Sequence, residues 1–138
     1  RLNSDTKPKW GKMNSPMMLK HCSRFIDVYL GKVTFNPFMF LFGFTFSFFH
    51  ISYLKYIVRY DINRYIRNLP TLKFFNTFKY KELDFDKEKY YLINSLRTVN
   101  QYEKDYIVNN FHGIVRNKTF KKVVNFHTSY HLNQFGVF

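Results

Sequence analysis

A long stretch without charge interrupts the mixed polar and apolar pattern of the chain. Between Lys32 and Lys55 lie 22 uncharged residues, VTFNPFMFLFGFTFSFFHISYL, of which eight are Phe. As an α-helix this stretch would rise about 33 Å, close to the roughly 30 Å hydrocarbon core of a bilayer. Asn36 suits the N-cap and Pro37 the first helical position. The stretch therefore predicts a transmembrane helix.

Two other structures fit parts of this stretch. Its strictly apolar part, residues 38–49, is also short enough for a buried core helix. Phe recurs at every second position from residue 38 to residue 48, which is the period of a strand. A lone strand has no barrel to join, because no companion segment shares the pattern. The total length and the flanking lysines favour the transmembrane helix.

The helical pattern continues beyond Lys55. Apolar and basic residues occupy separate faces at three- and four-residue spacing until Pro70, the first clear helix breaker. We therefore expect one helix over about residues 37–68, which would project beyond the membrane. Basic residues beside the span are candidates for contact with anionic lipid headgroups, such as those of cardiolipin. These candidates are Lys32, Lys55, Arg59, Arg64 and Arg67.

The segment before the span is basic. Pro8 and Pro16 disfavour helix, so residues 1–15 are expected to form an extended arm. Residues 17–32 have amphipathic spacing, and Gly31 suits the end of a helix. Such a helix fits a position along a membrane surface or against a neighbouring protein equally well.

The segment after the span has a soluble character. The spacing of apolar residues predicts a helix over about residues 86–111, and the β-branched and aromatic tail, residues 119–138, is expected to be extended. We expect its many Phe and Tyr side chains to pack on partner subunits, because aliphatic residues are too few for a large private core.

The expected fold class is mainly α, with three parts. Residues 1–32 form a basic arm and an amphipathic helix, and residues 33–69 form the single transmembrane helix and its extension. Residues 70–138 form an aromatic-rich soluble extension.

Composition narrows the class of protein further. Among 138 residues the net charge is +13, aromatics make up 22%, and Cys22 is the single cysteine. One cysteine excludes an intrachain disulfide framework and a zinc site built on several thiolates. The absence of Ala beside 13 Asn residues indicates AT-biased coding. The charge and the aromatics would suit RNA binding, but an RNA-binding protein has no use for a long uncharged stretch.

The sequence lacks the motifs of common catalysts. It contains no glycine-rich phosphate loop, no HExxH and no CxxC. His127 and His131 have metal-ligand spacing for a helix, but their segment is expected to be extended and no third ligand is apparent. His50 is expected near the membrane interface, since no carboxylate within the span could join it in a proton path. We therefore expect no catalytic residue, no cofactor site and no metal site.

The region from Arg24 to Tyr60 resembles subunit f of the mitochondrial ATP synthase. Residues 24–32, RFIDVYLGK, resemble the aromatic and basic segment that leads into the membrane, and residues 46–55, FSFFHISYLK, resemble the exit from it. This chain departs from the family in continuing some eighty residues beyond the span and in the many Phe residues of the span. The resemblance implies a non-catalytic role in the proton-translocating sector. It also implies an N-terminus in the matrix and a C-terminal part in the intermembrane space.

The function expected is that of a non-catalytic accessory subunit of a mitochondrial inner-membrane complex, in first place the ATP synthase of a divergent protist. A respiratory-chain complex, NADH dehydrogenase or cytochrome c oxidase, is the alternative. An RNA-binding protein of the mitochondrial ribosome is the third hypothesis. Expected partners are other subunits and membrane lipids, with no nucleic acid and no small-molecule substrate.

Overall fold

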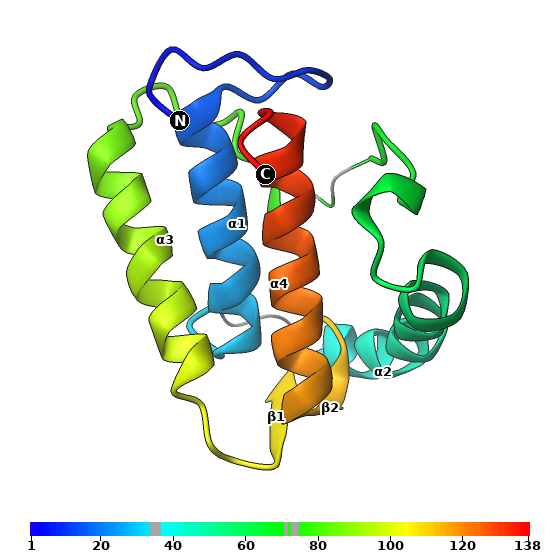
Figure 1. Cartoon of the computed structure of the whole chain (residues 1–138). Helices are drawn as coiled ribbons and strands as arrows, with labels where there is room; N and C mark the ends of the chain where they lie inside the picture. The colour runs from blue at the N-terminus through cyan, green and yellow to red at the C-terminus, as the bar shows by residue number, and fades with distance from the viewer. Residues whose placement is uncertain (34–36, 71, 73–74) are drawn as a thin grey trace.

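Three helices form the body of the molecule. The structure, a computed structural model, describes residues 1–33, 37–70, 72 and 75–138. Helix α1 (Ser15–Tyr29) lies between α3 (Phe85–Asn100) and α4 (Asn117–Gln134) (Figure 1). A hairpin of two antiparallel strands, β1 (Tyr106–Asn109) and β2 (Gly113–Arg116), connects α3 to α4. The prediction of a mainly helical chain is confirmed.

The predicted amphipathic helix is present as α1. Pro16 lies in its first turn, and the Asn14 side chain accepts a hydrogen bond of 2.9 Å from the Met17 amide. Gly31 follows the helix end with a φ of 70°, a left-handed conformation that glycine adopts without strain. The buried side of α1 includes Met18, Cys22, Phe25, Ile26 and Tyr29. Its packing neighbours are α3 and α4 of the same chain, so α1 is a central core helix.

The uncharged stretch is helical from residue 37 onward, and the strand alternative is wrong. Helix α2 (Pro37–Ser52) continues into a π-helical segment, η1 (Tyr53–Val58). Asn36, the predicted N-cap, lies outside the described residues. Within the described part of the chain, one stretch, Leu41–Val58, is long and apolar enough to cross a membrane.

The predicted extension of this helix to residue 68 is wrong. The helix ends at Val58, and Arg59 and Tyr60 follow with φ values of 55° and 54°. Between Tyr60 and residue 68, the predicted end of the helix, the chain forms a short 3-10 turn, η2 (Ile62–Arg64). Leu54 and Val58 are buried in the core. Packing of these two side chains therefore takes precedence over the helical spacing of apolar residues after Val58.

Two predictions for the C-terminal half are corrected. The helix expected to reach residue 111 ends at Asn100, and the hairpin follows it. The tail expected to be extended is helix α4, because its apolar residues recur at helical spacing and are buried. Many aromatics expected on partner subunits are buried within this chain instead. They are Phe75, Phe111, Phe120, Phe126, Tyr130 and Phe135.

The packing of α1 limits how α2 can meet a membrane. Helix α1 precedes α2 in the sequence, and helices α3 and α4 follow α2. Nevertheless, α1 packs against both α3 and α4. Elements in direct contact lie on the same side of a bilayer. A full crossing by α2, with residues 1–32 and 70–138 on opposite sides, would therefore require α1 to separate from α3 and α4.

Candidate functional site

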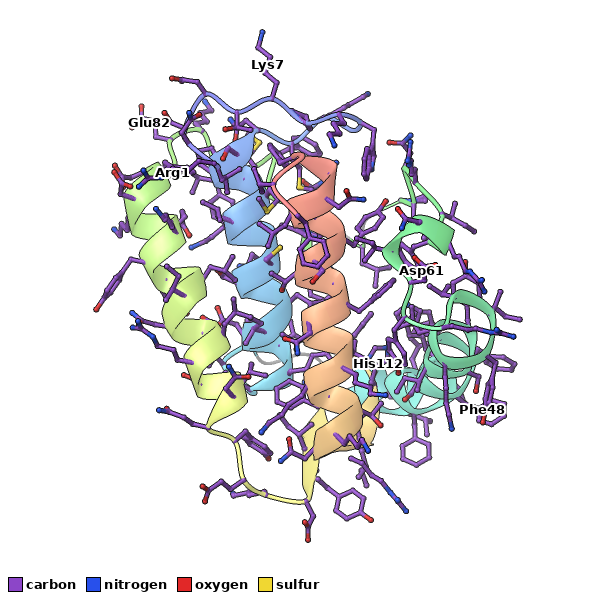
Figure 2. All side chains as sticks on the ribbon, viewed as in Figure 1. Arg1, Lys7, Phe48, Asp61, Glu82 and His112 are labelled. Carbon is purple, nitrogen blue, oxygen red and sulfur yellow. The ribbon has the colours of Figure 1, made fainter. Side chains whose placement is uncertain are left out.

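The outer face of α2 is an uncovered apolar surface. The Phe48 side chain is 70% exposed and points away from the three-helix body (Figure 2). Residues on successive turns of the same helix share this exposure, so the face is continuous along α2. We call it the α2 apolar face, and it comprises Leu41, Phe42, Phe48 and Phe49.

The opposite side of α2 packs on the hairpin. A Cβ atom at Gly43 would lie 2.6 Å from the carbonyl oxygen of Asn110, so only glycine permits this approach. The Phe46 ring lies against Phe111, with ring centroids 5.3 Å apart. The helix is therefore anchored to the rest of the chain along one side and bare on the other.

The basic residues predicted to bind lipid headgroups have different neighbours in the fold. Lys32 makes an ion pair of 3.3 Å with Asp27, and the Arg64 side chain lies 3.4 Å from Asp61. The Arg67 guanidinium covers the ring of Trp10 at 4.4 Å. Lys55 and Arg59, at the end of the apolar segment, are both exposed. These two are the members of the predicted set best placed for contact with headgroups at the end of the α2 apolar face.

Two histidines link α2 to the core. The Nδ1 atom of His50 lies 2.8 Å from Nε2 of His112, and Nδ1 of His112 is hydrogen-bonded to the Tyr29 hydroxyl. Figure 2 shows His112 between α4 and α2. His50, predicted to lie near the membrane interface, is therefore a contact between α2 and the three-helix body. Burial, and secondly the charge of His50, lower the pKa of His112 well below 6.5.

The other three histidines form a second cluster, between α1 and α4. His127 and His131 lie one turn apart on α4, and His21 faces them from α1. Nε2 of His21 is 3.2 Å from Nε2 of His127, and ring nitrogens of all three residues lie within 4.8 Å of one another. We call this set the histidine triad.

Neighbouring polar groups fix two of the triad rings. Nδ1 of His21 donates to the Phe75 carbonyl at 2.9 Å, and Nδ1 of His131 donates to Oε1 of Gln134 at 2.8 Å. The Gln134 amide is itself oriented, because its Nε2 donates to the Trp10 carbonyl at 2.6 Å. Phe25 stacks on His127, with centroids 4.0 Å apart and planes 11° from parallel.

Burial keeps the triad neutral. It is the largest cause that lowers the pKa of His131 to about 3, and it also lowers the pKa values of His21 and His127. Neutral imidazole is the form that binds metal ions. The three rings therefore present ligand-competent nitrogens at ordinary pH.

Two members of the triad have a spacing that is visible in the sequence, and the third does not. His127 and His131 have recognisable spacing, but their segment was expected to be extended. His21 lies 106 residues from His127, and no local pattern connects them. The helical spacing of buried residues in the tail was the one signal that could have placed the pair on a common face.

The sequence matches no protein-family model, and comparison with curated proteins and with solved structures finds no similar protein.

Proposed function

We propose that this chain is a non-catalytic accessory subunit of a mitochondrial inner-membrane complex, with α2 as its membrane-embedded element. The observation that carries the proposal is the α2 apolar face, which the rest of the chain leaves bare. Soluble monomers rarely expose a contiguous apolar surface of this kind, and where one occurs it usually contacts a membrane or another protein. The non-catalytic role is supported by the lack of catalytic motifs in the sequence.

Lipid is the occupant that the residues of this face favour. The 16 residues of helix α2 contain no charge, and the six residues of η1 contain one, Lys55. Helix α2 alone is about 24 Å long, and η1 brings the segment to about 30 Å. Tyr53, Tyr56 and Lys55 at its end are residue types that settle at the headgroup layer. The net charge of +13 would add attraction to an anionic membrane surface.

The fold favours a helix that enters the bilayer with its outer face while both flanking parts stay on one side. The single crossing predicted from the sequence, with the N-terminus in the matrix, is the competing arrangement. It requires the loss of the contacts that α1 makes with α3 and α4. Protease digestion of mitochondria with a ruptured outer membrane separates the two. If the protease cuts both residues 1–14 and the hairpin, or neither, the result supports one-sided binding. If it cuts one of the two and spares the other, the result supports the crossing.

The resemblance to subunit f makes the membrane sector of ATP synthase the first complex to test. Native purification through a tag on this chain would identify the complex by the subunits that accompany it. Rotor and stator subunits support the ATP synthase proposal, whereas haem or iron–sulfur subunits support the respiratory-chain alternative. Release of the chain from membranes by alkaline carbonate, or recovery with ribosomal RNA, would contradict a membrane-embedded subunit.

A further inference from the structure

We propose that the histidine triad of His21, His127 and His131 binds a single divalent transition-metal ion, for which Zn²⁺ is the probe. This inference is independent of the membrane role proposed above. The chain holds five histidines, and three of them converge from two helices on one point in the core. Imidazole is a preferred ligand of Zn²⁺, Cu²⁺ and Ni²⁺.

The spacing of the ring nitrogens fits a tetrahedral metal. Two nitrogens bound at 2.0–2.1 Å to a tetrahedral ion are about 3.3 Å apart. The Nε2 atoms of His21 and His127 are 3.2 Å apart, and the third ring nitrogen lies within 4.8 Å of both. An approach of the His131 ring to about 3.3 Å from the other two nitrogens would complete the triangle. Three imidazoles leave a fourth position open for water, as in three-histidine zinc sites.

The tautomers also favour an ion at this point. Because the Phe75 carbonyl and the Gln134 Oε1 can only accept, His21 and His131 carry their protons on Nδ1. Their Nε2 atoms therefore carry the lone pairs with which a metal would be bound. Hydrogen bonds from the second nitrogen to a carbonyl or amide are the usual outer support of a metal-bound histidine.

His127 has no tautomer that satisfies both of its nitrogens. Its Nδ1 is buried and has no hydrogen-bond partner within the described part of the chain. With its proton on Nε2, His127 can donate to His21, but Nδ1 is then a buried acceptor without a donor. With its proton on Nδ1, two lone pairs face each other at 3.2 Å. In that second tautomer, a cation between the Nε2 atoms turns the repulsive contact into two ligand bonds.

A simple core role would not require this arrangement. Three imidazoles packed only for their apolar rings would not need ring nitrogens within 4.8 Å of one another or two rings held by hydrogen bonds to Nδ1. His21 and His131 are buried and His127 is half-buried, so His127 is the most exposed member of the triad.

The test is a Zn²⁺ titration of the full chain in detergent after removal of metal with a chelator. Folded wild-type chain should bind one equivalent. His127→Gln and His131→Gln should each bind at least about tenfold more weakly, whereas the control His112→Gln, a buried histidine outside the triad, should bind as the wild type does. Equal binding by all four chains, or no saturable binding by the folded wild type, would overturn the proposal.

A second measurement needs no variant and so does not depend on how the variants fold. X-ray absorption of the zinc-loaded wild-type chain should show three imidazole ligands at about 2.0–2.1 Å. Fewer than three imidazoles, or a sulfur ligand from Cys22 or a methionine, would refute the triad as the site.

Discussion

The backbone carbonyl of Asn110 lies so close to Gly43 that a methyl group on Gly43 would come within 2.6 Å of its oxygen. The neighbouring Phe111 carbonyl would be 3.1 Å away. Both obstacles are backbone atoms of the hairpin, which cannot rotate aside as a side chain can. The contact explains why position 43, between two Phe residues of α2, has no room for a side chain.

Gly43→Ala should therefore weaken the packing of α2 on the hairpin. We expect a net loss of about 1–2 kcal/mol in the free energy of unfolding, since the clash exceeds the gain of about 1 kcal/mol in helix preference. Urea unfolding in detergent would measure it. Thr45→Ala, at an exposed position two residues later, should change stability by a few tenths of a kcal/mol. A stabilised Gly43→Ala chain would refute this packing.

Phe48→Arg should remove the chain from membranes. An arginine at the depth of the hydrocarbon core costs at least about 2.5 kcal/mol, and Phe48 is 70% exposed on the α2 apolar face. The measurement is the fraction of chain that stays with membranes after carbonate extraction. Tyr90→Arg, on α3 and 68% exposed, is the matched control and should keep the wild-type fraction. Equal membrane fractions for both variants would mean that a protein, and not lipid, covers the face.

Stability should fall as the pH drops below about 6.5. His112 is neutral in the folded chain because burial, and then the charge of His50, lower its pKa. The unfolded chain takes up a proton near pH 6.5, and the folded chain does so only at lower pH. The stabilisation is therefore present above pH 6.5 and is lost progressively below it, at up to about 1.4 kcal/mol per pH unit for each such histidine.

His112→Gln should reduce this dependence of stability on pH by up to about 1.4 kcal/mol per pH unit, the contribution of one proton. The groups that face His112 are the Tyr29 hydroxyl from α1 and His50 from α2, and neither carries a negative charge that would favour a protonated His112. Urea midpoints between about pH 5 and pH 7 would give the slope for both chains. An identical slope in the variant would mean that His112 is not among the groups that titrate on unfolding.

Local signals were enough to predict α1 and α2. In α1, regular apolar spacing and Gly31 after the end agree with one another, and Pro16, taken as a residue that disfavours helix, lies in the first turn. In α2, the length and the lack of charge indicate an apolar environment. A helix is the element that forms all of its backbone hydrogen bonds within one segment in such an environment. Both predictions rest on residues that are neighbours in the chain.

The features that were missed depend on residues far apart in the sequence. The tail is rich in β-branched and aromatic residues, yet burial of Phe120, Val123 and Val124 against the core makes it helix α4. The helix that was expected to continue beyond Lys55 ends at Val58, because the Leu54 and Val58 side chains pack into the core. The histidine triad joins α1 to α4, and its third member could be found only once both helices were placed.

Tyr91 and Asp27 provide the last prediction, which concerns the interface between α3 and α1. The Tyr91 hydroxyl lies 3.1 Å and 3.0 Å from the two carboxylate oxygens of Asp27, which is only 9% exposed, and Lys32 lies 3.3 Å from the same carboxylate. Loss of a hydrogen bond to a buried charge costs about 1–3 kcal/mol. Tyr91→Phe should therefore lower the free energy of unfolding by that amount, as measured by urea unfolding. Tyr90→Phe, which removes a hydroxyl from the exposed neighbour, should leave it unchanged. If both variants match the wild type, the Asp27 carboxylate is solvated and the contact between α1 and α3 does not depend on it.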